Sequence, residues 1–414
     1  MLLIHNAMLL RMTGEPAQIG YISIESPMIR AVGFGQPPAN LLAEHDQVID
    51  AAGGWLLPGM IDAHCHVGIY QDGQAVEVDE GNEMTDPVTP QLQANDGIFI
   101  DDVCFGEALA HGVTGVMTGP GSANVLAGHF SLLRTTGRTA ESMTIRANSA
   151  MKAAFGENPK RVYGRKDKTP STRMATAAIL RESLAKTRDY RDEKARKAAD
   201  PTVSFSRDAR WDALLPVLSG ELPLKIHAHR SDDILTAIRI ANEFGLRYTI
   251  DHCTEGYLIA DLLTSEYQAG QQTGHGCGQP GLGRLEGVIV GPLLTDRSKP
   301  ELSRANIKNP GILAAAGIPV AIMTDHPVMP VQYLPVSVAV AVRAGMDEQQ
   351  ALAAMTITAA RLCGADDVLG SLEVGKIADL SLFSEHPLNY RSFARLVFSQ
   401  GQLVYCAEGE GEIC

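Results

Sequence analysis

Short apolar runs separated by glycine and proline occur at both ends of this chain. The first such segment extends from Leu2 to Asp50, and the last extends from Gly375 to Tyr405. Runs of this length between turn-forming residues are typical of short β-strands. We therefore expect a small β-rich unit at each end, and we expect the two units to pair with each other.

Between the two ends, apolar runs alternate with stretches of helical periodicity. The expected strands are 59–64, 113–118, 143–147, 150–155, 222–229, 248–252, 288–290 and 320–325. Eight such strands with helices between them indicate a closed parallel barrel. The expected fold class is α/β, a (β/α)8 TIM barrel over residues 58–365 with a small β-sandwich domain built from residues 1–57 and 366–414.

Two helical segments can be predicted in more detail. Ser231 begins a helix with an acidic first turn, and Ile234, Ile238 and Ala241 lie on its apolar face. This helix directly follows a strand that ends in histidine. Residues 160–202 are rich in charged side chains, so we expect an exposed helical insertion there.

Composition narrows the function classes. Hydrophobic residues make up 45% of the 414 residues and charged residues 20%, which is typical of soluble globular proteins. The net charge is −13 without a basic block, so neither nucleic acid nor an anionic membrane is an expected partner. No apolar run approaches ~18 residues, and we expect no membrane span and no signal peptide. A small-molecule substrate is the expected partner.

The cysteines indicate a cellular compartment. Seven of them are scattered along the chain, and none forms a C-x-x-C pair. A disulfide framework or a structural zinc knuckle is not expected from this pattern. A reducing, cytoplasmic location fits it best.

Histidines occur in pairs at the ends of two expected strands. The first barrel strand ends in His64 and His66, and a later strand ends in His227 and His229. Because side chains alternate along a strand, the two imidazoles of a pair leave on the same face and can chelate one ion. The carboxyl ends of parallel barrel strands form one rim, so all four imidazoles are expected there.

Two further strands end in metal-binding residue types. His252 ends strand 248–252, and Asp325 ends strand 320–325. Polar groups at the ends of four apolar strands must be paired or ligated if they are buried. Imidazole and carboxylate suit zinc, and manganese, iron or cobalt fit the same kind of site. We expect one or two divalent ions, with zinc as the first choice.

As a set, the motifs resemble those of the amidohydrolase superfamily, in the branch of imidazolonepropionase-related and prolidase-like enzymes. The resemblance covers essentially the whole chain. Its motifs are Pro58–His66, Pro120–Asn124, Phe155–Arg161, His227–Arg230, Thr324–Pro327 and Gly370–Leu380. One departure is the glycine- and glutamine-rich stretch within 265–287, which looks like an insertion relative to the family and could reshape or cover a pocket at the rim.

The resemblance implies a set of metal ligands: His64, His66, His227, His252 and Asp325. Asp325 would take a proton from a metal-activated water and pass it to the leaving nitrogen. His252 would bind a second metal or else polarise the substrate carbonyl. The implied reaction is hydrolysis of a C–N bond in a small cyclic amide, a dipeptide with a free carboxylate or an N-acyl amino acid. The resemblance also allows a homo-oligomer.

Many relatives bridge two metals with a carboxylated lysine or a glutamate after the fourth strand. Lys152 lies in strand 150–155, where carboxylation would need a desolvated, unprotonated amine. Glu157 follows in a turn and needs no modification. The sequence does not choose between Lys152 and Glu157, and a site with one metal also stays open.

Substrate contacts are less strongly indicated. His229 and Arg230 stand beside a presumed ligand and could hold a substrate carboxylate, for which the arginine fork is well matched. A second role for both is structural support of the site. The acidic stretch 77–83 falls where barrel loops set specificity, and it can also be a solvated loop.

Two other functions stay open. A deaminase of the superfamily usually carries H-x-x-E after the fifth strand, but this position reads His227-Ala228-His229-Arg230. Arginine cannot protonate a ring nitrogen, so hydrolysis at a carbonyl is preferred. A non-catalytic barrel kept for binding or assembly would lose its metal ligands, whereas this chain keeps them.

Overall fold

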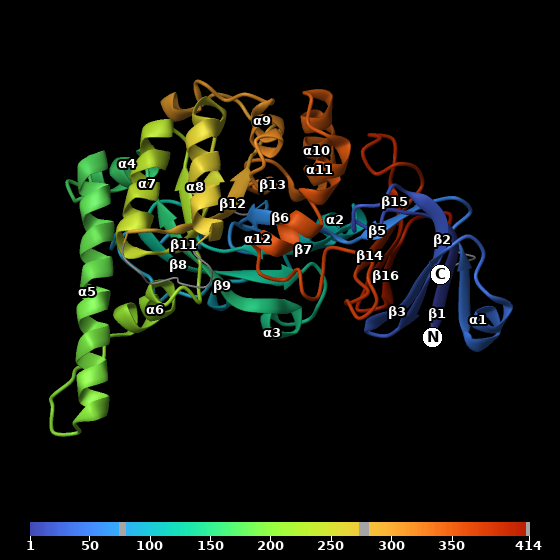
Figure 1. The fold of residues 1–414 in the computed structure, drawn as a ribbon, viewed down its shortest axis with the longest axis horizontal. Coiled ribbons are helices and arrows are strands. Elements are labelled where there is room, and N and C mark those ends of the chain that lie inside the picture. The colour runs from blue at the N-terminus through green and yellow to red at the C-terminus, as the bar shows by residue number, and fades with distance from the viewer. Residues whose placement is uncertain (74–79, 273–280, 411–414) are drawn as a thin grey trace.

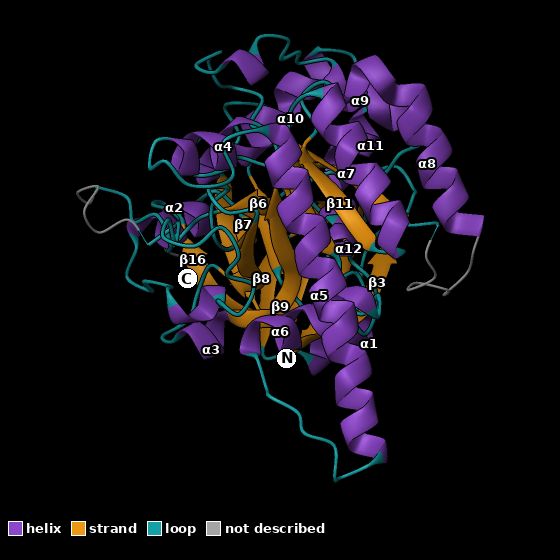
Figure 2. Ribbon diagram, turned by 90° about the vertical axis from the view of Figure 1, so that its left-hand side faces the viewer, coloured by secondary structure: helices purple, strands orange, loops and turns teal. Residues whose placement is uncertain are grey.

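The computed structural model describes residues 1–73, 80–272 and 281–410. Its strands form two separate sheets (Figure 1). One sheet is a nearly closed barrel, and the other combines strands from both ends of the chain. Helices surround the barrel (Figure 2). The fold class is therefore the α/β TIM barrel with a terminal β unit that the sequence predicts.

The barrel sheet positions the site. Its strands are β6 (Met60–Cys65), β7 (Val113–Thr118), β8 (Leu126–Arg134), β9 (Thr144–Ala154), β10 (Leu224–Ala228), β11 (Arg247–His252), β12 (Arg284–Val290) and β13 (Val320–Ile322). They follow one another in sequence order around the sheet. All neighbours pair in parallel except at β8, which is antiparallel to both β7 and β9.

Strand β8 corrects the expectation of a wholly parallel barrel. The two strands expected at 143–147 and 150–155 are one strand, β9, and β8 takes the other place. All nine residues of β8 are buried, so its sequence shows no alternation. The seven residues 119–125 join β7 to β8. They are too few for the crossover helix that a parallel neighbour would need, so the two strands form an antiparallel hairpin.

Contacts between β6 and β13 nearly close the barrel. The backbone N–H of Asp325 donates to the carbonyl of His64 (3.1 Å), and that of His66 donates to the carbonyl of His326 (2.9 Å). Farther from the rim, the backbone N–H of Ile61 instead donates to the carbonyl of Met355, which lies in the helical segment after β13. The strand ends at the rim are thus held together directly.

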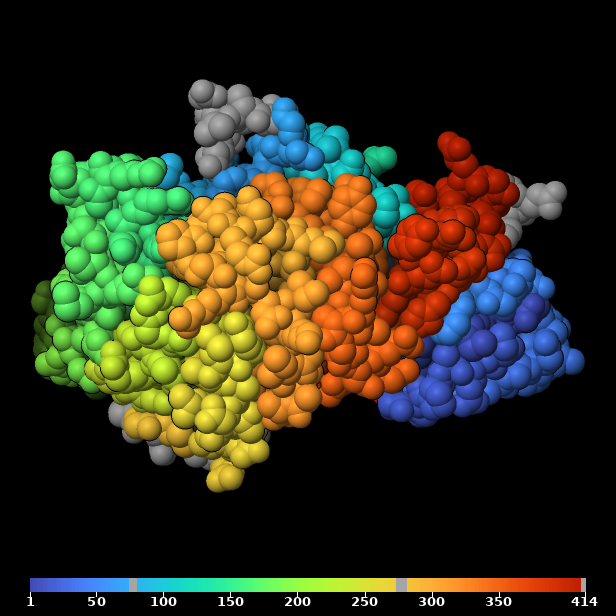
Figure 3. Space-filling model, turned by 90° about the horizontal axis from the view of Figure 1, so that it is seen from above, coloured from blue at the N-terminus to red at the C-terminus, as the bar shows by residue number. Residues whose placement is uncertain are grey.

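The terminal sheet joins residues that are far apart in sequence. Its strands are β1 (Leu2–Leu9), β2 (Gln18–Glu25), β3 (Met28–Phe34), β4 (Gln47–Asp50), β5 (Trp55–Pro58), β14 (Leu380–Phe383), β15 (Ala394–Ser399) and β16 (Gln402–Cys406). β14 pairs antiparallel with β5, which confirms the predicted pairing of the two ends. The sheet has its own apolar cluster, and Figure 3 shows the C-terminal segment between the barrel and the N-terminal strands. The exact domain boundaries stay a prediction.

Helices cover the outer face of the barrel, except α1, which lies beside the terminal sheet (Figure 1). They are α1 (Ala39–Glu44), α2 (Val103–Ala110), α3 (Ala140–Met143), α4 (Glu157–Gly164), α5 (Arg173–Ala199), α6 (Ala209–Leu218), α7 (Ser231–Phe244), α8 (Ala260–Gln272), α9 (Asn309–Ala315), α10 (Leu334–Arg343), α11 (Glu348–Ala353) and α12 (Ile357–Leu362). α7 begins at Ser231 as predicted and ends where Gly245 turns left-handed. α5 extends beyond the barrel in Figure 1, but Leu180 and Leu184 are buried, so the expected exposed insertion is only partly exposed.

Two expectations from composition can be compared with the structure. Within the described residues, no helix is both long enough and apolar enough to span a bilayer. Four cysteines are free buried thiols: Cys65, Cys104, Cys253 and Cys363. Cys406 is disulfide-bonded.

Candidate metal centre

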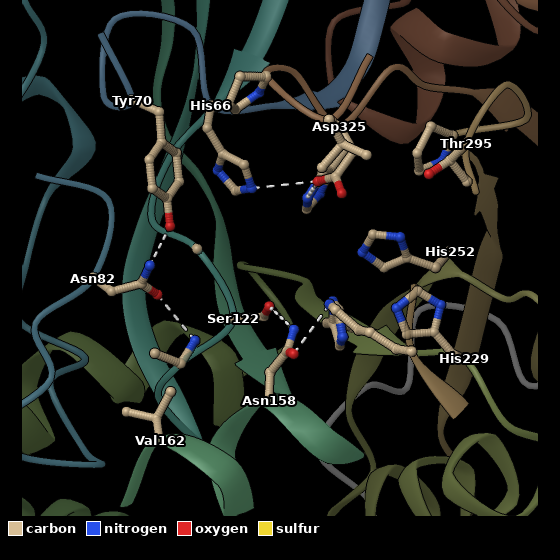
Figure 4. A pocket seen from close by; sticks show the side chains of 18 of the residues that line it. His66, Tyr70, Asn82, Ser122, Asn158, Val162, His229, His252, Thr295 and Asp325 are labelled. Atoms are coloured by element: carbon tan, nitrogen blue, oxygen red, sulfur yellow. Dashed lines mark hydrogen bonds and ion pairs between the residues drawn. The ribbon is translucent and has the colours of Figure 1, made fainter. Parts of the chain in front are cut away.

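The carboxyl ends of the barrel strands bring polar side chains to one pocket (Figure 4). β6 ends beside His64 and His66, β10 contains His227, β11 ends at His252, and Asp325 follows β13. All five side chains line a cavity of about 380 Å³. The structure therefore brings together the five residues that are far apart in sequence.

These side chains lie close enough to share ligands. Oδ1 of Asp325 is 3.4 Å from Nε2 of His64 and 3.4 Å from Nε2 of His66. The ring centroid of His252 is 5.6 Å from that of His64 and 4.3 Å from that of His227. This spacing allows the groups to coordinate one ion or two adjoining ions.

Hydrogen bonds on the far side of two rings fix their orientation. Nδ1 of His66 donates to the carbonyl of Gly119 (2.7 Å), and Nδ1 of His252 donates to the carbonyl of Gly291 (3.0 Å). A carbonyl only accepts, so each Nδ1 carries the proton and each Nε2 presents a lone pair. Contacts of this kind orient histidines that bind metals.

The donor set fits a divalent metal. The ligand atoms of His64, His252 and Asp325 lie within 4.8 Å of one another, and so do those of His227, His229 and His252. Nε2 of His227 is buried and has no hydrogen-bond partner among the described residues. A buried nitrogen without a partner is destabilising unless a ligand satisfies it.

Burial keeps the histidines in the neutral form that binds metal. It lowers the pKa of His64 to about 4, and the nearby Lys152 adds to this shift. It also lowers the pKa of His252 to about 3. Burial and the neighbouring His252 hold the pKa of His227 well below its ordinary value. At neutral pH these imidazoles are therefore available as ligands.

Lys152 of β9 reaches the same group of side chains. Its Nζ lies 3.4 Å from Nε2 of His64, and its side chain is fully buried. Burial lowers the pKa of Lys152 to about 8. Burial therefore shifts this amine toward the unprotonated form that carboxylation requires.

Asp325 is ionised and held in an unusual backbone conformation. Burial alone would raise its pKa, but His252 and the adjoining imidazoles of His64 and His66 hold the pKa of Asp325 well below its usual range. The backbone φ is 53° at Asp325 and 65° at His252. For residues other than glycine this left-handed region costs about 1–3 kcal/mol, and it is concentrated at functional sites.

Two residues predicted to serve the site do not line the pocket. Arg230 makes a two-pronged ion pair with Asp232, with distances of 2.9 and 2.8 Å. Glu157 begins α4, and its backbone N–H donates to Glu301. Neither is among the side chains around the cavity.

Other expectations have mixed outcomes. His229 lines the pocket, but its Nδ1 shares a hydrogen bond of 2.8 Å with Oγ1 of Thr254, and its ring packs 4.4 Å from that of His252. Residues 77–79 of the acidic stretch lie outside the described residues, and Asn82 of the same stretch lines the pocket. In the expected 265–287 insertion, residues 265–272 continue α8, and 273–280 lie outside the described residues.

A buried ion-pair network beneath His64 was missed. Oδ2 of Asp251 lies 2.9 Å from Nδ1 of His64, and Oδ1 accepts a hydrogen bond from Nζ of Lys225 (3.2 Å). Burial would raise the pKa of Asp251, but Lys225 and His64 hold it well below its usual range. Asp251 precedes a strand-end histidine, and Lys225 lies two residues before another, which was the available signal.

We expect Asp251→Asn to weaken metal binding about 10- to 100-fold, the range for lost contacts behind metal ligands. The uncharged amide holds the His64 ring less strongly than a carboxylate does, and it can also turn its NH2 group toward Nδ1, so Nε2 is no longer firmly directed toward the pocket. Metal affinity is measured by competition with a chelator. Because Asp251→Asn leaves Lys225 without its carboxylate, Asp251→Asn with Lys225→Met is the variant that separates this effect from misfolding. Unchanged affinity in both would contradict the positioning role.

The metal-free protein should lose stability as the pH falls from about 6.5 toward 4. The folded pKa values of His64 and His252 are about 4 and about 3. Their unfolded values lie near 6.5, so the unfolded state binds more protons in this window. Each imidazole then contributes a loss of about 1.4 kcal/mol per pH unit. Urea unfolding of chelator-treated protein measures this, and a flat free energy of unfolding between pH 7 and 5 would contradict it.

Comparisons with known proteins agree with this geometry. Residues 281–404 match the model of the amidohydrolase family. A crystal structure of an amidohydrolase from Thermotoga maritima MSB8 superposes with a TM-score of 0.90 at 36% identity, covering 98% of this chain and 100% of that one. A prolidase complexed with N-methylphosphonate-L-proline has the same fold at 18% identity, with a TM-score of 0.56 and coverage of 98% and 100%.

Curated relatives give a similar picture. An imidazolonepropionase from Aromatoleum aromaticum is 28% identical over 89% of this chain and 86% of its own length. The amidohydrolase tasK from Hapsidospora irregularis is 26% identical over 89% of this chain. The match spans only 38% of the length of that second relative.

Proposed function

Because this chain belongs to the amidohydrolase family, we propose that it is a metal-dependent hydrolase that cleaves the C–N bond of an amide in a small molecule. One observation carries the proposal. The buried Nε2 of His227, which has no hydrogen-bond partner among the described residues, adjoins neutral imidazoles and an ionised carboxylate in one pocket. This combination has the chemistry of a divalent metal site rather than of a satisfied core.

The proposed ligands are His64, His66, His227, His252 and Asp325, with Lys152 as the candidate bridge between two ions. A bound divalent metal, zinc as the first choice, would lower the pKa of water and polarise a carbonyl. Glu157 does not line the pocket, so the geometry favours Lys152 over Glu157 as the bridge.

The remaining chemistry belongs to side chains of this chain. Asp325 takes the proton of the attacking water and then passes it to the leaving nitrogen, which leaves as a neutral amine. Its low pKa keeps it ionised and ready to accept. His252 orients the substrate carbonyl if it does not serve a second ion. Deamination is disfavoured, because the acid it needs is replaced by Arg230, which pairs with Asp232.

Metal analysis and a substrate panel test this proposal. Protein expressed with added zinc is assayed for bound metal, and for hydrolysis of N-acyl amino acids, dipeptides and cyclic ureides. We expect one or two ions per chain and turnover of at least one class that disappears on chelation and returns with zinc. A protein that binds no metal and hydrolyses no amide would instead be a non-catalytic barrel.

A further inference from the structure

The pocket has a second wall that contributes no proposed metal ligand. It consists of Ser122 from the loop before β8, Asn158 and Arg161 from α4, and Lys299 from the segment after β12. In Figure 4, Ser122 and Asn158 point toward one another on the side of the pocket away from His66. We call these four residues the polar wall.

Local structure brings α4 to this position. Gly156 joins β9 to α4 with a φ of 85°, a conformation that side-chain-bearing residues rarely adopt. A Cβ at this position would lie 2.7 Å from Oε2 of Glu301. The tight turn begins α4 directly at the rim, so that side chains of its first turns face the cavity.

A chain of hydrogen bonds organises the polar wall. Nζ of Lys299 donates to Oδ1 of Asn158 (3.1 Å), and Nδ2 of Asn158 donates to Oγ of Ser122 (2.7 Å). Lys299 uses one of its three protons in this way, and the hydroxyl proton of Ser122 stays available. Asn158 therefore holds an ammonium and a hydroxyl in place, and both have donors left for a ligand.

The cations of the polar wall lack acidic partners. Among the described residues, no carboxylate oxygen lies within 4.0 Å of the charged nitrogens of Arg161 or Lys299. Glu301 is close in sequence, but its Oε2 accepts the backbone N–H of Glu157. The acidic side chain around the cavity, Asp325, belongs to the proposed metal centre. Two cations without a direct ion pair to any described residue are notable in a chain with a net charge of −13, although Lys299 lies near enough to Glu301 to counter the rise in pKa that burial gives that carboxyl.

We propose that the polar wall binds a carboxylate of the substrate, held by Lys299, Arg161 and the Ser122 hydroxyl. The inference rests on the proposed function for the reaction and adds the substrate class. An N-acyl amino acid or a dipeptide would place its free carboxylate on the polar wall and its amide at the metal centre. Charge-assisted hydrogen bonds to a planar carboxylate are the interactions that arginine and lysine make best. Arg161 and Lys299 thus take the part that the sequence indicated for Arg230.

Matched ligands test the proposal without turnover. N-acetylglycine and N-acetyl-L-proline are compared with their neutral carboxamides for binding to the zinc-loaded protein, by ligand-observed NMR titration. We expect each acid to bind at least about tenfold more tightly than its amide, the effect of one or two charge-assisted hydrogen bonds. Equal binding of acid and amide by the wild-type protein would overturn the proposal.

Variants identify the source of the preference. In the double variant Lys299→Gln with Arg161→Gln, the ratio of acid affinity to amide affinity should fall to about one. The control Arg165→Gln should keep the wild-type ratio, because Arg165 is exposed at the end of α4 and does not line the pocket. Thermal unfolding confirms that the variants fold, as expected for side chains that are not buried. If the preference survived the double variant, the acids would be binding the metal instead, and the polar wall would be excluded.

Two further outcomes are informative. Inorganic phosphate that competes at much lower concentration than the acids, with the same dependence on Lys299 and Arg161, would overturn the carboxylate assignment in favour of a phosphate. A preference for acids in a protein that hydrolyses no amide would support the polar wall and contradict the proposed function. Turnover of amides without any preference for acids would support the proposed function and contradict the role of the polar wall.

Discussion

Replacing Asp325 by asparagine is expected to lower kcat by about a thousandfold or more. The amide keeps the size of the side chain but cannot accept the proton of the attacking water, and proton transfer of this kind contributes about 10²–10⁴ to a rate. The neighbouring His64 and His66 keep their positions, so most of the metal should stay bound. Turnover and metal content are measured on the same preparations.

A matched control separates this effect from a loss of charge. Asp261 is exposed on α8 and does not line the pocket, so Asp261→Asn should keep the wild-type kcat. A value of kcat for Asp325→Asn within tenfold of the wild type would exclude Asp325 as the proton acceptor. If Asp325→Asn lost both its metal and its activity, the main role of Asp325 would be that of a metal ligand.

Lys152→Met is expected to reduce the number of bound metal ions and to lower kcat by about a hundredfold or more. If Lys152 bridges two ions, its removal takes away a ligand of both. The fold should tolerate the change, because methionine has a similar volume and removes a desolvated amine from a fully buried position. Metal per chain is measured by elemental analysis, and stability by thermal unfolding.

Glu157→Gln is the variant for the other bridge that the sequence left open. Glu157 does not line the pocket, so this variant should keep the wild-type metal content and kcat. The reverse pattern, with metal lost in Glu157→Gln and kept in Lys152→Met, would make Glu157 the bridging residue. Full metal content in both variants would indicate a site without a bridge from β9.

The convergence of side chains at the candidate metal centre could largely be predicted from sequence. His64, His66, His227 and His252 each end an apolar run, and alternation along a strand determines which side chains share a face. Since the carboxyl ends of parallel strands share one rim, local periodicity was enough to place them together. Membership of the amidohydrolase family, expected from the motifs, is confirmed.

The polar partners of the centre could not be predicted in the same way. Lys152 and Glu157 are five residues apart, and only the turn at Gly156 decides that one faces the pocket and the other does not. Arg230 and Lys299 are both cations near the rim, but Arg230 finds Asp232 beside it in sequence. Such choices depend on the paths of loops, which no periodic pattern encodes.

The sequence by itself determined the alternation of strands and helices and the histidines at the strand ends, because these follow from local patterns of two or about four residues. It also indicated the pairing of the two ends, through the β-rich character that both ends share. Only the tertiary structure decided that β8 runs antiparallel, that Asp251 and Lys225 lie beneath His64, and that Lys299 bonds to Asn158 in the polar wall. These are contacts between distant segments, and their geometry is set by the packing of the whole barrel.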